Sequence, residues 1–205
     1  MDKKINDNTG LDKYWEENYR RSLEYGGAYF GTGYTMLAAA EVLFRQTCRN
    51  RKEFFRKNRG KTKFTPGHWK KTKEESLLLG FLPATLLLAL AIENFIKDYY
   101  CCIDRTLRAR DSKIPKKLGK HDLVKLFVEC NIQLTEKEKL LLEYLHAHLV
   151  WRGRYTIPKD SKEYAKYYSS NFEEIEVYKS FEKNNKFSPE VVSILKKLGV
   201  RYRGI

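Results

Sequence analysis

The sequence contains little cysteine, with four residues in a chain of 205 and no C-x-x-C pair among them. The adjacent Cys101 and Cys102 would point to different faces of a helix. This pattern argues against a disulfide framework and against a zinc site, so we expect no metal and no cofactor. The amino terminus, MDKKINDNTG, is polar and lacks a secretory hydrophobic region. These features predict a protein of the reducing cytoplasm.

Long hydrophobic runs are also missing. The most apolar segment, Leu77–Ile92, is 16 residues long, which is shorter than the roughly 20 residues that a membrane-spanning helix needs. Gly80 and Pro83 interrupt this segment, and the charged residue Glu93 follows it. We therefore predict a buried core helix and no membrane span.

The sequence has no convincing run of alternating polar and apolar residues, so β-strands are not expected. Apolar residues recur instead at spacings of three and four, as in amphipathic helices. A hydrophobic content of 42%, of which aromatic residues are a large part, is enough to form a packed core. These patterns predict an all-α protein with one core and room for an appended subdomain.

Helix-start and helix-stop signals divide the chain into helical regions. The expected helices cover residues 11–25, 34–55, 74–105, 122–129, 136–151, 172–183 and 189–199. One buried stripe of the second helix contains Met36, Leu37, Ala40, Leu43, Phe44 and Thr47. Pro83 is expected to kink or split the third helix. The glycine-rich run 26–33 lacks the Lys-Ser/Thr pair of a phosphate-binding loop, so we expect a flexible turn there.

The start of the helix at 136–151 has the clearest signal. Thr135 and Glu138 have the spacing of a capping box, in which each side chain accepts a hydrogen bond from the main-chain N–H of the other residue. The apolar side of this helix is expected to contain Leu141, Tyr144, Leu145, His148 and Leu149. His146 and His148 are two residues apart and diverge on a helix, so they cannot share a metal ion without other help.

Three segments, in this order, resemble the HEPN family of helical domains. They are AIENFIK at 91–97, GKHDLVKL at 119–126, and WRGRY at 151–155 with Pro158 after it. The resemblance covers residues 75–160. It implies an antiparallel four- to five-helix bundle for these residues. The helix signals outside them predict extra helices in a basic N-terminal region, 1–74, and in a C-terminal region, 161–205, which the resemblance does not explain. The resemblance also implies a frequent dimer in prokaryotic phage-defence and toxin–antitoxin settings.

Many HEPN domains are metal-independent RNases that use an arginine followed, four to six residues later, by a histidine. This chain departs from that pattern, because none of its four histidines follows an arginine at that interval. The chemistry of metal-free RNA cleavage still allows a divergent site. In that site His121 is the general base or acid, and Arg152 and Arg154 hold the phosphate. The alternative is that His121 caps its helix and both arginines fix their loop.

Glu93 and Lys97 stand one helical turn apart on the apolar helix 74–105. Because their surroundings are apolar, we expect them to face a polar seam of the bundle. There they can orient Arg152 or Arg154, although a purely structural pair is the simpler interpretation.

Positive charge is concentrated between Arg45 and Lys73. This stretch holds 12 lysine and arginine residues against one acidic residue, Glu53, so it carries a net charge of +11 out of +14 for the whole chain. Aromatic residues are interleaved with the cations, which suits phosphate contact combined with base stacking. The candidate nucleic-acid-binding residues are Arg49, Arg51, Lys52, Arg56, Lys57, Arg59, Lys61 and Lys63, and the interleaved aromatic residues are Phe54, Phe55, Phe64 and Trp69.

A solvated charged face with the aromatic side chains in the core is the alternative interpretation. The leading functional hypothesis is a non-catalytic, HEPN-like protein that binds nucleic acid, with RNA preferred, in prokaryotic or phage-related defence or regulation. A divergent metal-independent RNase is the second hypothesis. A helical interaction module that forms a homodimer or binds a partner protein is the third.

Overall fold

The computed structural model describes residues 27–57, 81–107, 115–152 and 175–202, together with the isolated helical positions 13, 17 and 21. The described residues are mainly helical and include no β-strand, which confirms the all-α prediction. No helix among them is long and apolar enough to cross a membrane. The expected domain boundaries at 74/75 and 160/161, and most of the expected helix at 11–25, lie outside the described residues.

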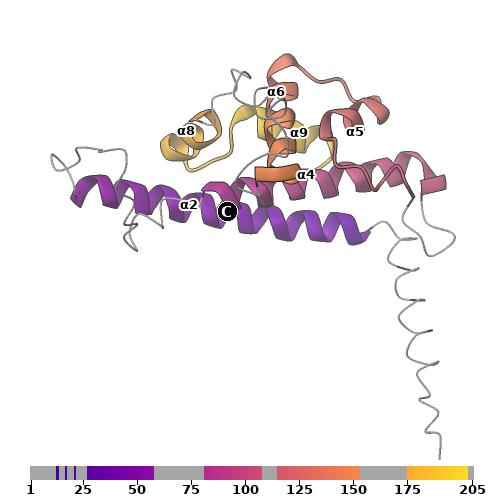
Figure 1. The fold of residues 1–205 in the computed structure, drawn as a ribbon, viewed down its shortest axis with the longest axis horizontal. Coiled ribbons are helices and arrows are strands. Elements are labelled where there is room, and N and C mark those ends of the chain that lie inside the picture. Colours follow the sequence, from indigo (N-terminus) through magenta and orange to yellow (C-terminus); the bar gives the residue numbers. More distant parts are fainter. Residues whose placement is uncertain are drawn as a thin grey trace, which may run out of the picture.

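Two long antiparallel helices form the base of the fold (Figure 1). They are α2 (Gly27–Lys57) and α4 (Phe81–Ile103). Gly33 near the start of α2 lies against Phe95 toward the end of α4, and Phe44 lies near Phe81, with ring centroids 6.2 Å apart. α2 and α4 therefore run in opposite directions along their contact.

From Gly27 on, the glycine-rich run belongs to α2, so the prediction of a flexible turn was wrong for residues 27–33. A Cβ atom on Gly33 would come within 2.7 Å of the Phe95 ring. The absence of a side chain at this position lets the backbone of α2 approach α4 closely. Tyr34 and Phe30 then pack edge-on against the same ring, with centroid distances of 5.3 and 5.7 Å. Tertiary packing here outweighs the low helix propensity of glycine.

The predicted stripe of α2 faces the core. Leu37, Ala40, Phe44 and Thr47 are buried, while Met36 and Leu43 are partly buried and pack against the core. On α4, residues on both sides of Pro83 are helical, so this proline does not split the helix. It lies near the start of α4, where a missing amide N–H costs little.

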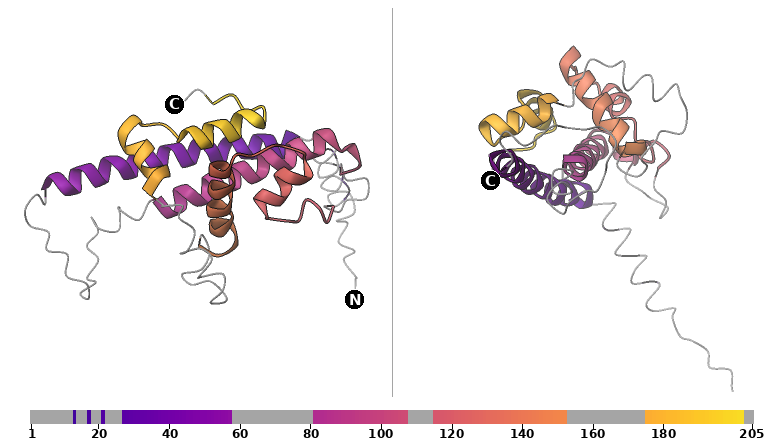
Figure 2. Two further views of the ribbon diagram at one scale, coloured as in Figure 1. Left: turned by 90° about the horizontal axis from the view of Figure 1, so that it is seen from above. Right: turned by 60° about the vertical axis from the view of Figure 1, so that its left-hand side comes forward.

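Shorter helices cover one side of the α2–α4 pair. They are α5 (Leu123–Glu129), α6 (Glu136–Ala147), α8 (Ile175–Asn184) and α9 (Pro189–Lys197). A short 3-10 helix, η2 (Arg105–Leu107), follows α4, and a π-helical turn, η3 (His148–Arg152), follows α6 and packs against α4. The views in Figures 1 and 2 agree that α6 runs across the α2–α4 axis, not along it.

The local signals for α6 and α9 are confirmed. Thr135 and Glu138 form the predicted capping box, and Ser188 caps α9 ahead of Pro189. The two helices are joined through Glu138, whose carboxylate is buried. Its Oε2 accepts hydrogen bonds from the Thr135 main-chain N–H (2.7 Å) and from Lys197 Nζ (2.6 Å), and its Oε1 accepts one from Ser193 Oγ (2.8 Å). A cap residue of α6 therefore also anchors α9.

Candidate functional site

A buried carboxylate on α4 holds the histidine that precedes α5. The Oε1 atom of Glu93 lies 3.0 Å from Nδ1 of His121 and also accepts a hydrogen bond from Nζ of Lys97. Glu93 and Lys97 are both buried, whereas the side chain of His121 is 52% exposed. His146 on α6 joins this group, because its Nδ1 lies 2.8 Å from the main-chain oxygen of His121. We call these four residues the histidine–carboxylate cluster.

The hydrogen-bond partners define the tautomers of both rings. An ionised carboxylate and a carbonyl oxygen can only accept, so Nδ1 donates in His121 and in His146. In the neutral state, Nε2 of each ring then carries a lone pair and can take up a proton. A carboxylate that fixes an imidazole in this way orients it for general acid–base chemistry.

His121 does not cap α5. The cap is Asp122, whose Oδ1 accepts a hydrogen bond from the Lys125 main-chain N–H at 3.0 Å. His121 is therefore available for its contact with Glu93, which lies 28 residues earlier in the chain. Glu93 and His121 were each singled out in the sequence, but no sequence pattern predicts that their side chains are in contact.

The second carboxylate oxygen of Glu93 is buried and has no hydrogen-bond partner among the described residues. An unsatisfied buried oxygen costs stability. Such a cost is often found where a group serves function in addition to packing.

The two arginines predicted for the catalytic site are not described at the level of side chains. The main chain of Arg152 belongs to η3, which packs against α4, the helix that carries Glu93. The Arg152 side chain and the whole of Arg154 lie outside the described residues. His148 is buried, its Nδ1 is 3.0 Å from the Tyr144 main-chain oxygen, and its ring packs on that of Tyr144. It is a core residue, as predicted.

A line of exposed cations follows the last two and a half turns of α2. Arg49, Lys52 and Arg56 are all exposed, and their spacing of i, i+3 and i+7 puts them on one face of the helix. The three Cα atoms span about 10 Å along the helix axis. We call these residues the basic stripe.

Three further cations of this region have defined local contacts. Arg45 pairs with buried Glu41 at 2.6 Å, Lys57 pairs with Glu53 at 2.9 Å, and the guanidinium of Arg51 lies 5.6 Å from the centroid of the Phe55 ring. Over residues 45–57 six cations stand against one carboxylate, a net charge of +5. The hydrogen bond and charge of Lys57, with the charge of Arg56, lower the pKa of Glu53, although slight desolvation opposes them.

The basic stripe lies where α2 extends beyond the rest of the described fold. In Figures 1 and 2 the C-terminal end of α2 reaches past α4 and α8. A helix end that projects in this way can enter a groove or lie along a phosphate backbone. Three further candidate residues, Arg59, Lys61 and Lys63, lie outside the described residues, as do Phe64 and Trp69.

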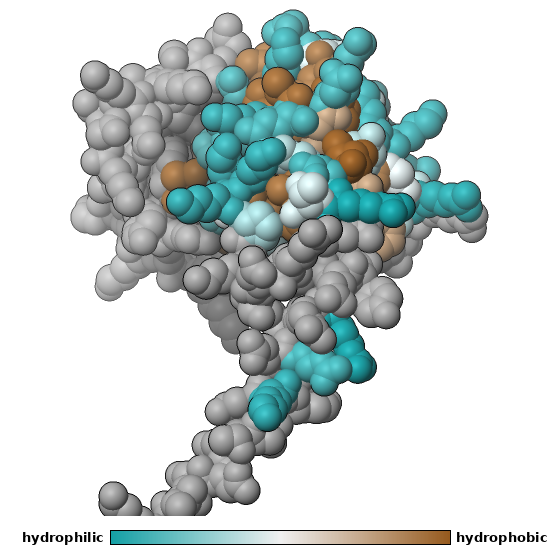
Figure 3. Space-filling view, turned by 90° about the vertical axis from the view of Figure 1, so that its right-hand side faces the viewer, coloured by the Kyte–Doolittle hydropathy of each residue, from teal (hydrophilic) through white to brown (hydrophobic). Residues whose placement is uncertain are grey.

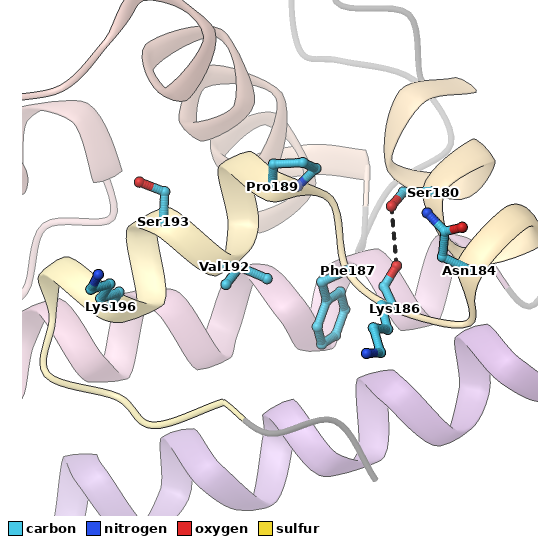
Figure 4. Close-up of a pocket in the computed structure, with 8 residues that line it drawn as sticks. All are labelled: Ser180, Asn184, Lys186, Phe187, Pro189, Val192, Ser193 and Lys196. Atoms are coloured by element: carbon cyan, nitrogen blue, oxygen red, sulfur yellow. Dashed lines mark hydrogen bonds between the residues drawn. The ribbon is translucent and has the colours of Figure 1, made fainter.

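A shallow depression of about 700 Å³ lies at the turn between α8 and α9 (Figure 4). Phe187 and Val192 are among the residues that line it, and Ser180 Oγ, also in the lining, donates a hydrogen bond to the Lys186 main-chain oxygen at 3.2 Å. No carboxylate, histidine or cysteine is among the described residues that line it. Because the depression is open and lacks a carboxylate, a histidine and a cysteine, we do not assign it as the functional site.

Within the described ranges, no group of three or more His, Cys, Asp or Glu side chains is arranged to hold a metal ion. Comparisons with protein-family models, with curated proteins and with solved structures found no match. The structure thus defines the class of fold, an all-α protein with a basic helix end and a histidine–carboxylate cluster. The resemblance to HEPN domains stays a prediction from the sequence.

Proposed function

We propose that this protein is a non-catalytic, HEPN-like protein that binds nucleic acid through the basic stripe of α2. The observation that carries the proposal is the alignment of Arg49, Lys52 and Arg56 on one exposed face of a projecting helix. Neither Arg49 nor Arg56 forms an ion pair with any described residue. Cations that are not neutralised within the protein release counterions when they contact phosphates.

The proposal makes a quantitative claim about salt. Each phosphate contact contributes about 0.7 to the slope of log K against log salt for single strands, and about 0.9 for duplex DNA. Replacing all three residues of the basic stripe by glutamine should therefore weaken binding and reduce the slope by about 2 to 3.

A matched control is available outside α2. Lys116, in the turn before α5, Lys125 in α5 and Lys137 in α6 are all exposed. Their replacement by glutamine removes the same charge as the stripe variant. Fluorescence anisotropy with labelled RNA and DNA at several salt concentrations should show a large loss for the stripe variant and a small one for the control. Equal losses of affinity in the stripe variant and the control would mean that binding depends only on the net charge of the protein. An affinity that does not change with salt concentration would rule the proposal out.

The proposed setting, prokaryotic or phage-related defence or regulation, comes from the HEPN resemblance. Neighbouring genes for a nucleotidyltransferase or a defence module would support it, and neighbours with unrelated roles would oppose it. A homodimer, which HEPN domains often form, can be tested by light scattering of the full chain.

The histidine–carboxylate cluster favours a second candidate, a divergent metal-independent RNase. In this reaction Nε2 of His121 removes the proton of a 2′-hydroxyl group, and the 2′-oxygen attacks the adjacent phosphorus. The bond from phosphorus to the 5′-oxygen breaks, and the imidazolium of His146 protonates that oxygen. The products carry a 2′,3′-cyclic phosphate and a 5′-hydroxyl group. Glu93 acts as a positioning residue for His121, and Arg152 and Arg154 contact the phosphate.

RNA degradation in excess EDTA tests the second candidate. Activity should disappear in His121→Ala and fall in Arg154→Ala, whereas Lys125→Gln, which changes a neighbouring exposed residue, should retain it. Glu93→Gln should lower the rate and alter its pH profile, which a purely structural residue would not do. Equal activity of the native protein and His121→Ala would reject this candidate.

The third hypothesis, an interaction module, has less support. Val128 and Ile103 are exposed, but in the face drawn in Figure 3 the coloured apolar residues form small patches separated by hydrophilic ones. A protein-binding surface generally has a more continuous apolar centre.

A further inference from the structure

An exposed aromatic ring lies beside the basic stripe. The side chain of Phe55 is 50% exposed, whereas phenylalanines of the core, such as Phe44 and Phe95, are almost completely buried. Phe55 is adjacent to Arg56 and three residues after Lys52, so it projects from the neighbouring side of the same turns of α2. The core interpretation of this aromatic residue was therefore wrong.

The Phe55 ring is held in place by two neighbours. The Arg51 guanidinium lies over it, 5.6 Å from its centroid, and the Phe54 ring meets it edge-on with a centroid distance of 5.8 Å and an interplanar angle of 80°. A cation over a ring face and an edge-on aromatic neighbour both restrict its orientation. Phe55, with the Arg51 guanidinium over its ring, thus forms a partly exposed platform next to three cations.

We propose that this platform stacks on an unpaired base, so that the ligand of the basic stripe is a single-stranded nucleic acid. In a duplex the base faces are stacked on one another and cannot reach an aromatic side chain. A single strand offers both its phosphates and the flat faces of its bases, which suits a surface that combines cations with an aromatic ring. This inference rests on the proposed binding through the basic stripe and adds the class of ligand.

The test compares three substitutions of Phe55 in the full-length chain. Phe55→Tyr keeps an aromatic face, Phe55→Leu keeps apolar volume without one, and Phe55→Ala removes both. Because half of the side chain is already in solvent, the urea midpoint should change little in each variant. The ligands are a labelled oligo(U), an oligo(dT), a duplex of equal length and an abasic oligodeoxynucleotide.

For the single strands, Phe55→Leu and Phe55→Ala should lower affinity about 5- to 150-fold, the range expected for one stacked base. Phe55→Tyr should retain most of the affinity, and the salt slope should not change. The native protein should prefer a single strand to the duplex. On the abasic strand, Phe55→Leu should bind as well as the native protein. Equal single-strand affinity of Phe55→Leu and native protein, or a preference for the duplex, would overturn the inference.

The stripe variant separates the two proposals. If it loses affinity and salt slope while Phe55→Leu binds normally, the basic stripe binds nucleic acid without stacking. If the stripe variant binds like the native protein, the proposed function itself fails.

Discussion

Lys97 and Glu93 form an ion pair inside the core, one turn apart on α4, with side chains that are 9% and 6% exposed. A charge left alone in such a place is costly, because water no longer solvates it. We expect Glu93→Ala to lower the free energy of unfolding by about 3 to 5 kcal/mol, the usual effect of removing one partner of a buried pair. Urea unfolding at neutral pH measures this change.

A second pair of the same spacing provides the control. Glu53 and Lys57 also stand four residues apart, but both are more than half exposed. Glu53→Gln should leave the urea midpoint unchanged, because water screens an exposed pair. The double substitution Glu93→Leu with Lys97→Met should recover much of the stability that Glu93→Ala loses. If Glu93→Ala were as harmless as Glu53→Gln, the buried pair would not be a structural element of the core.

Two glycines of α2 should respond in opposite ways to the same substitution. A Cβ atom at Gly33 would overlap the Phe95 ring, whereas one at Gly31 would meet nothing within 4 Å. Gly33→Ala should cost about 1 to 3 kcal/mol through overpacking. Gly31→Ala should add about 0.5 to 1 kcal/mol, because alanine loses less entropy on forming a helix.

Thermal or urea unfolding distinguishes the two variants. In a Phe95→Leu background Gly33→Ala should lower the free energy of unfolding by less, since the smaller leucine side chain leaves room for the alanine methyl group. A coupling energy near zero between the two positions would contradict the close approach of α2 and α4.

These two glycines also show where prediction from the sequence stops. The capping box at Thr135 and Glu138 is a local pattern, because the two residues are three positions apart and bond to each other. It was predicted correctly, together with the buried face of α6. The prediction for the glycine-rich run was wrong because the helix there depends on the contact of Gly33 with the Phe95 ring, 62 positions later in the chain. Without knowledge of that contact, the low helix propensity of glycine predicts a turn.

The candidate site shows the same limit. The basic stripe could be predicted from the sequence, because charge and helical spacing are both local. The contact between His121 and Glu93 could not, since nothing near His121 specifies a partner on α4. His121 was the cap that the alternative interpretation expected for α5, whereas the Asp122 side chain accepts the capping hydrogen bond from the Lys125 main-chain N–H.

The Glu138 carboxylate should make the stability of the fold depend on pH in the acidic range. Its burial by itself raises the pKa, but hydrogen bonds from Lys197, Thr135 and Ser193, together with the charge of Lys197, lower the pKa below its usual value of 4.5. A carboxyl group with a lowered pKa stabilises the fold fully above its unfolded-state pKa, and this contribution is lost as pH falls through the folded-state pKa. The loss should therefore begin below about pH 5.

Glu138→Gln tests this dependence. At pH 7 it should cost about 1.5 to 3 kcal/mol, because the charge-assisted bond to Lys197 is lost. The difference in the free energy of unfolding between Glu138→Gln and the native protein should become smaller as the pH is lowered toward 3, since the Glu138 carboxylate of the native protein then becomes protonated. Urea midpoints over this pH range provide the measurement. A difference that is constant with pH would show that Glu138 does not titrate in the folded protein.

The four cysteines should differ sharply in reactivity. Cys102 is exposed, whereas Cys48, Cys101 and Cys130 are buried. Burial, followed by the negative charges of Glu129 and Cys101, raises the pKa of Cys130 to about 12. The thiolate is the reactive form, so Cys130 should remain protonated and unreactive at pH 8.

A disulfide reagent that reports released thiolate should therefore titrate one thiol rapidly in the native chain at pH 8, and four after denaturation. Cys102→Ser should abolish the rapid phase without changing the slow one. A Cys130→Ser variant should leave the rapid phase unchanged, because that thiol is buried at the C-terminal end of α5. Two rapid thiols in the native protein would contradict the burial of Cys48, Cys101 and Cys130.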